Sequence, residues 1–230
     1  MSAIPIVALD VPTLADAQAL VTRLGASADF YKVGLELFTA EGPPVVRWLR
    51  AAGKRVFLDL KLHDIPNTVR GAAASAARLD VQLLTVHGGG GEVMVRAAVD
   101  GAGERTGILA VTVLTSFDAA ALAAASGRAD IAVPGEVMRL AGIARAAAAH
   151  GIVCSGEEVA AVRAAHGDAL APLVPGIRFA DGDAHDQRRV VTPAEGQRRG
   201  ARYLILGRAV TGASDPAAAM ARVHEELAAP

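Results

Sequence analysis

Cysteine is nearly absent from this chain of 230 residues, which contains only Cys154. A lone cysteine excludes an internal disulfide and a cluster of thiolate metal ligands, and it is typical of proteins from a reducing compartment. We therefore expect a cytoplasmic protein in which Cys154 is a small buried apolar side chain. Aromatic residues are also scarce, at 3% of the chain, so the core must be built from aliphatic side chains and alanine.

The chain also lacks an excess of charge of either sign, because 23 basic residues face 24 acidic ones. This balance argues against the broad basic surface of proteins that bind nucleic acid or anionic membranes. No uncharged run approaches the roughly 20 residues that cross a bilayer, and the apolar start at residues 4–9 has no basic leader. We expect no nucleic-acid partner, no membrane partner and no signal peptide.

Short apolar stretches alternate along the chain with longer stretches of helical spacing. Eight of the short stretches are predicted strands, each followed by a helix. They span residues 4–9, 30–34, 56–62, 81–87, 107–114, 152–154, 170–175 and 203–206. Eight such units predict an α/β protein with a closed (β/α)8 TIM barrel, formed as a single domain by residues 1–230. An open doubly wound sheet is the alternative, but the turn at residues 9–13 lacks the glycines of its dinucleotide-binding form.

The third predicted strand ends in three charges of alternating sign, Asp59, Lys61 and Asp64. Alternation along a strand places Phe57, Asp59, Lys61 and His63 on one face. A helix is expected to start at residue 66, which is proline, so Asp64 falls in the turn before it. Ionised groups cost several kcal/mol to desolvate, so this cluster indicates a functional site. A helix cap is the alternative role for Asp64.

Other polar residues end neighbouring strands, and a closed barrel gathers such ends around one mouth. Asp10 and Lys32 form a second pair of opposite charge, although Lys32 could instead be a lysine that extends its ammonium to solvent at a strand edge. His87 is most simply a packing histidine. No His-x-x-x-His motif or carboxylate cluster occurs, so we expect no metal site.

The residues at the ends of the seventh and eighth predicted strands are of the types that bind phosphate. Residues 175–178 read Pro-Gly-Ile-Arg and residues 207–208 read Gly-Arg, with Gln187 in the loop between them. Glycine lets the backbone approach a phosphate, and a guanidinium can bind it with two hydrogen bonds. Barrel enzymes often bind phosphate with these two loops. The two arginines at matching strand ends therefore predict a phosphate monoester ligand, whereas either alone could be a surface charge.

Residues 57–69, Phe-Leu-Asp-Leu-Lys-Leu-His-Asp-Ile-Pro-Asn-Thr-Val, resemble the signature of the orotidine 5'-phosphate decarboxylase family. Supporting matches run nearly end to end, at residues 8–10, 31–34, 86–88, 114–116, 174–178, 186–193 and 206–208. The four glycines at 88–91 depart from the expected turn. Asp-x-Lys-x-x-Asp alone also occurs in related sugar-phosphate barrels, but the following Ile-Pro-Asn-Thr makes the match specific.

The resemblance implies that orotidine 5'-phosphate (OMP) loses carbon dioxide to give uridine 5'-phosphate (UMP), without a cofactor or metal. Lys61 would protonate C6, with Asp59, Asp64 and Lys32 completing the catalytic charges. The substrate contacts it implies are Asp10, Lys32, Asp59, Ile65, Thr68, Thr115, Pro175, Arg178, Gln187, Gly207 and Arg208. Of these, Asp10 and Lys32 would bind the ribose and Thr115 the pyrimidine. The family is homodimeric, and Asp64 and Thr68 would reach into the partner's site.

Two other functions remain open from the residues alone. A metal-dependent sugar-phosphate barrel, of the keto-gulonate-phosphate decarboxylase or hexulose-phosphate synthase type, would lose activity with a chelator. A catalytically silent nucleotide-binding barrel would bind UMP-like ligands tightly without turnover.

Overall fold

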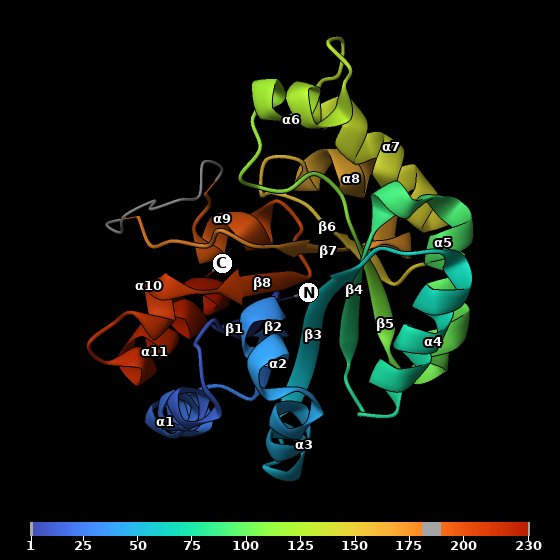
Figure 1. Cartoon of the computed structure of the whole chain (residues 1–230). Coiled ribbons are helices and arrows are strands. Elements are labelled where there is room, and N and C mark those ends of the chain that lie inside the picture. Colours follow the sequence, from blue (N-terminus) through green and yellow to red (C-terminus); the bar gives the residue numbers. More distant parts are fainter. Residues whose placement is uncertain (1, 181–189, 230) are drawn as a thin grey trace.

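The computed structural model describes residues 2–180 and 190–229, in which eight parallel strands close into a barrel in chain order (Figure 1). The strands are β1 (Ile4–Leu9), β2 (Phe30–Gly34), β3 (Arg55–Leu62), β4 (Leu83–His87), β5 (Gly107–Val111), β6 (Gly151–Val153), β7 (Ala171–Val174) and β8 (Tyr203–Leu206). Strand β1 pairs with both β2 and β8, so the sheet has no edge. The predicted TIM barrel is confirmed, and the open sheet is wrong.

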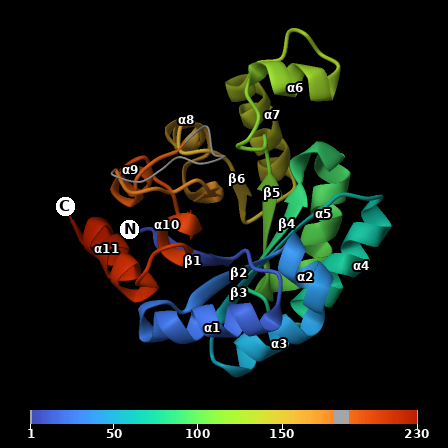
Figure 2. The ribbon, with the colours of Figure 1, turned by 60° about the vertical axis from the view of Figure 1, so that its left-hand side comes forward.

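Helices cover the outside of the barrel, and α11 lies beside α1 so that the ring of helices also closes (Figure 2). They are α1 (Leu14–Leu24), α2 (Leu35–Glu41), α3 (Pro43–Ala51), α4 (Pro66–Ala77), α5 (Gly91–Ala102), α6 (Ala119–Ser126), α7 (Val133–Ala146), α8 (Val159–His166), α9 (Pro193–Arg198), α10 (Arg208–Thr211) and α11 (Pro216–Ala228). The sequence pattern did not predict α2 or α10, because helices of seven and four residues are too short to show a clear period. Within the described residues, no helix has the length and apolar character needed to span a bilayer.

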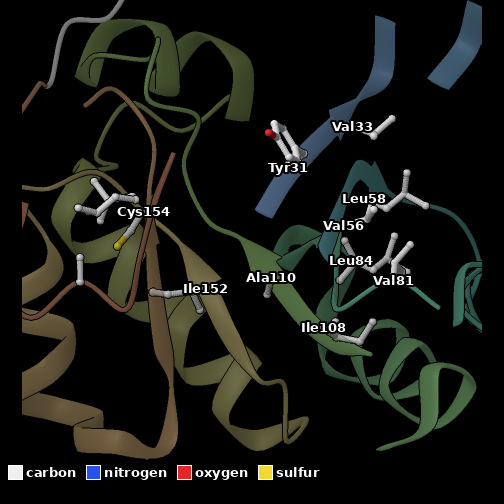
Figure 3. Close-up of a cluster of buried hydrophobic side chains, with 14 of the residues drawn as sticks. Tyr31, Val33, Val56, Leu58, Val81, Leu84, Ile108, Ala110, Ile152 and Cys154 are labelled. Carbon is white, nitrogen blue, oxygen red and sulfur yellow. The ribbon is translucent and has the colours of Figure 1, made fainter. Parts of the chain in front are cut away.

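Alternation along the strands divides the core into two layers. One layer fills the barrel and includes Ile6, Phe30, Phe57 and Leu109. The other lies between the sheet and the helices, where Figure 3 shows Val56, Leu58, Leu84 and Ile152 among its side chains. Cys154 belongs to this outer layer and is fully buried, as expected for an apolar role.

Several helices start at a residue whose side chain caps the first turn. Thr192 and Glu195 form both halves of a capping box at the start of α9. Asp215 accepts a hydrogen bond from the Ala218 N–H at the start of α11. Strand β5 ends at Val111, earlier than the apolar run predicts, because the following residues leave the ladder and line the cavity at the barrel mouth.

Candidate active site

A cavity of about 480 Å³ opens at the carboxyl ends of the strands. Its wall contains Ala8, Asp10, Lys32, Phe57, Asp59, Lys61, Val111, Val113, Leu114, Thr115, Val153, Leu173, Pro175, Gly176, Arg178, Ile205, Gly207, Arg208 and Thr211. The closed barrel thus brings together residues from both ends of the sequence, from Ala8 to Thr211. Most of the predicted site residues lie in this wall.

The charged side chains that follow β1 and that lie on β2 and β3 form a connected array. Lys32 Nζ lies 2.6 Å from Asp10 Oδ1 and 3.9 Å from Asp59 Oδ2, and Lys61 Nζ lies 2.8 Å from Asp59 Oδ2. Lys32 is 8% exposed, so it is not a lysine at a strand edge with its ammonium in solvent. Two ammonium groups share the Asp59 carboxylate and face the cavity, which favours binding of a ligand that is anionic or becomes anionic.

Strand β3 carries an irregularity where its charges lie. Leu58 pairs with Leu84 and Leu62 with Val86, so four steps along β3 match two along β4. Lys61 adopts a φ of 50° in this bulge, a left-handed conformation that lysine seldom takes. Asp59 and Lys61 share the cavity face with Phe57, as alternation predicts.

His63 departs from that alternation. Its ring lies outside the cavity wall and 5.5 Å from the ring of His87. The positive φ at Lys61 and the end of the strand at Leu62 turn the chain away before His63. The period-two rule therefore holds as far as Lys61 and fails at His63.

The predicted phosphate site lies at the end of the cavity beside β7 and β8. Arg178 is 7% exposed, and burial, followed by the charge of Arg208, lowers the pKa of its guanidinium. Gly176 has a φ of 75°, which favours glycine at this turn. Two neighbouring guanidinium groups repel each other, so an anion placed between them would be stabilised. Gln187 lies outside the described residues.

Asp64, Ile65 and Thr68 lie beyond the cavity wall and are exposed in the single chain. Asp64 Oδ1 accepts a hydrogen bond from the Ile65 N–H at 2.6 Å, and Ile65 is the N-cap residue of α4. The alternative in which Asp64 caps this helix is therefore wrong. Contact of Asp64, Ile65 and Thr68 with a substrate remains a prediction that requires a second chain.

Sequence reasoning missed two residues at the site. A Cβ on Gly34 would lie 2.8 Å from Lys32 Nζ and 3.3 Å from Asp10 Oδ1, so the glycine leaves room for that ion pair. Thr85 on β4 bonds to Asp59 and to the Lys61 backbone. Two features of the sequence could have indicated them: Gly34 is a glycine at the end of β2, and Thr85 is a polar residue inside the apolar strand β4.

His87, at the end of β4, makes the stability of the folded chain depend on pH. Burial, followed by the charges of His63 and Lys61, lowers the pKa of His87, while the carboxylate of Asp59 opposes this shift. The unfolded chain then binds more protons at this position than the folded protein, so the free energy of unfolding falls as the pH drops below about 6.5.

We expect His87→Gln to lose less stability than the wild type between pH 7.5 and pH 5.5, by at most about 1.4 kcal/mol per pH unit. Urea unfolding at both pH values measures this difference, and His224→Gln, at an exposed position of α11, is the control. Equal losses in the wild type and His87→Gln would contradict the lowered pKa.

Metal binding has little support in the described part of the chain, where no three His, Cys, Asp or Glu side chains are grouped as a ligand set. The conspicuous acids are instead paired with lysines: Asp59 contacts both Lys32 and Lys61, and Asp10 contacts Lys32.

The chain closely resembles known proteins over nearly its whole length. A model of the orotidine 5'-phosphate decarboxylase / HUMPS family matches residues 4–223. Orotidine 5'-phosphate decarboxylase from Anaeromyxobacter dehalogenans is 56% identical over 214 residues, covering 92% of each chain. The enzyme of the same name from Moorella thermoacetica is 48% identical over 230 residues, covering 96% of this chain and 91% of the relative.

Solved structures agree with the sequence relatives. The crystal structure of orotidine 5'-phosphate decarboxylase from Lactobacillus acidophilus matches with a TM-score of 0.88 at 35% identity, covering 100% of both chains. The chain therefore belongs to the orotidine 5'-phosphate decarboxylase / HUMPS family.

Proposed function

We propose that the whole chain acts as one catalytic unit that converts OMP to UMP and carbon dioxide, the last step of de novo pyrimidine biosynthesis. The observation that carries this proposal is the pair of ammonium groups, Lys32 and Lys61, joined through Asp59 at the wall of a cavity whose other end holds Arg178 and Arg208. The similarity to curated decarboxylases supports the same conclusion.

The proposed chemistry uses Lys61 as the proton donor. Breaking the bond between C6 and the carboxylate releases carbon dioxide and leaves an electron pair on C6 with no adjacent group to delocalise it. An ammonium beside C6 stabilises that charge as it develops and then transfers a proton from Nζ to C6. Solvent returns a proton to Lys61 after product leaves. Asp59, 2.8 Å from Nζ, positions the ammonium.

The remaining residues are proposed to orient the substrate through contacts to parts of the molecule other than C6. Asp10 and Lys32 are proposed to bind the ribose hydroxyls, and Thr115 the pyrimidine. The proposed phosphate contacts are Pro175, Arg178, Gln187, Gly207 and Arg208. Binding energy from the phosphate, far from C6, would help to organise the site for the reaction.

A homodimer is the assembly we propose, with Asp64, Ile65 and Thr68 facing the partner's substrate. The support is a set of exposed apolar side chains after three successive strands: Leu35 is 53% exposed, Ile65 67% and Val93 72%. These residues follow β2, β3 and β4, so they lie on the side of the barrel that carries the cavity. Exposed apolar side chains on one side of a protein are typical of an interaction surface.

We expect Val93→Glu to convert a dimer into a monomer at about 1–10 μM, because a desolvated charge in the interface costs several kcal/mol. Activity per chain should fall as well, since each site would lose the partner's Asp64 and Thr68. Sedimentation velocity measures the assembly, and Ala124→Glu, exposed on α6, is the control. A monomeric wild type, or a dimeric and fully active Val93→Glu, would contradict the proposed interface.

The proposed reaction is tested by the ultraviolet absorbance change of OMP with purified protein, with and without EDTA. Turnover that EDTA leaves unchanged is expected. No turnover of OMP, together with EDTA-sensitive turnover of a sugar phosphate, would favour the metal-dependent sugar-phosphate reaction, whereas tight UMP binding without turnover would identify a silent nucleotide-binding barrel. We also propose a cytoplasmic location, which the lone buried Cys154 supports.

A further inference from the structure

Thr85 lies under the charged array and connects two of its parts. The side chain is fully buried on β4. Thr85 is two residues after Leu83 and therefore on the same face of the strand, and Leu83 belongs to the core inside the barrel. Its Oγ1 donates a hydrogen bond to Asp59 Oδ1 at 2.8 Å. The same oxygen accepts a hydrogen bond from the Lys61 backbone N–H at 2.9 Å. One hydroxyl therefore contacts both the carboxylate and the backbone of the lysine it pairs with.

The first bond fixes the carboxylate. Asp59 presents Oδ1 to Thr85 and Oδ2 to Lys61 Nζ, at 2.8 Å in each case. A carboxylate held at one oxygen cannot rotate freely about its terminal bond, so the other oxygen stays directed at the ammonium.

The second bond fixes the bulge. The ladder pairs between β3 and β4 stop at Leu58 and resume at Leu62. In this gap Lys61 holds a φ of 50°, which a β-carbon disfavours. Strained conformations persist where the surroundings hold them in place, and the Thr85 hydroxyl supplies a hydrogen-bond acceptor for the Lys61 N–H.

We propose that Thr85 is a positioning residue of the decarboxylase site, which sets the direction of the Lys61 ammonium through Asp59 and through the bulge. It is not a lining residue of the cavity, so it acts through these neighbours rather than by touching substrate. The inference rests on the proposed role of Lys61 as proton donor.

The test compares kcat for OMP and the Kd for UMP in Thr85→Val and Thr85→Ser. Valine keeps the shape but can make neither hydrogen bond, whereas serine can make both. We expect Thr85→Val to lower kcat by about 10- to 100-fold, because small misplacements of a reacting group have effects of this size. The Kd for UMP should change by less than about threefold in Thr85→Val, and Thr85→Ser should recover kcat to within about threefold of the wild type.

Thr106→Val is the matched control, because Thr106 is also buried and its hydroxyl bonds to the Val81 carbonyl, at the opposite end of β4 from the cavity. It should lose stability without a comparable loss of kcat. If Thr85→Val does not fold, Thr85→Ala replaces it, and its kcat should lie at least about tenfold below that of Thr85→Ser.

Two results overturn the inference: equal kcat losses in Thr85→Val and Thr85→Ser, or a Thr85→Val kcat within about threefold of that of Thr106→Val. Failure of the proposed function has a different result, because the wild type itself would then not turn over OMP. An active Lys61→Ala enzyme would instead overturn the role of Lys61, and the inference with it.

Discussion

Replacing Lys61 with alanine is expected to lower kcat/KM for OMP by at least about 10⁴-fold, since the change removes both the proton donor and the charge that stabilises the C6 carbanion. The Kd for UMP should change much less, because UMP lacks the carboxylate that leaves and its ribose and phosphate contacts lie elsewhere in the cavity. Stopped-flow absorbance of OMP and calorimetric titration of UMP measure the two quantities.

Lys54→Ala is the control for this variant. Lys54 lies just before β3, at the end opposite to the cavity, where its Nζ donates to the backbone oxygens of Ala28 and Gly25. The Lys54→Ala variant should be less stable than the wild type but should keep the wild-type kcat. A Lys61→Ala variant that retains more than about 1% of the wild-type kcat/KM would show that another group protonates C6.

Replacing Arg208 with alanine is expected to lower kcat/KM for OMP by about 10²- to 10³-fold, the effect of losing a charge-assisted contact to phosphate. Arg208 is exposed at the cavity wall, so its removal should cost little stability. The loss should nearly disappear with orotidine, which has the same base and ribose but no phosphate. The comparison of OMP with orotidine therefore assigns the effect to the phosphate.

Arg198→Ala, at an exposed position on α9, provides the control and should leave both substrates unaffected. An equal loss of activity toward OMP and orotidine in Arg208→Ala would place this guanidinium near the base or ribose instead. The neighbouring Arg178 is a less suitable first target, because its side chain is buried and its removal would also disturb the packing.

The closed barrel could be predicted because its signal is repeated and local. Each of the eight apolar stretches is short, each is followed by a helical pattern, and the structure contains a strand at every one. Polar residues such as Lys32 and Asp59 interrupt apolar strands at a high desolvation cost. That cost marks them as a site even before the strands are placed in space.

The bulge in β3 could not be predicted, because it depends on pairing with β4. Nothing in the local sequence requires the register to shift between Leu58 and Leu62 or Lys61 to adopt a positive φ. The same shift ends the alternation that placed His63 beside Lys61. For this reason the sequence pattern was right for Asp59 and Lys61 and wrong for the next residue on that face.

The sequence by itself determined the barrel, the identity of the charged residues and the two arginine-bearing strand ends, because hydrophobic period and ionic charge are properties of short segments. Only the tertiary structure decided that Gly34 makes room for Lys32 and that Thr85 connects Asp59 to Lys61. Such contacts join different strands, and their distances follow from how the sheet twists and closes rather than from any one segment.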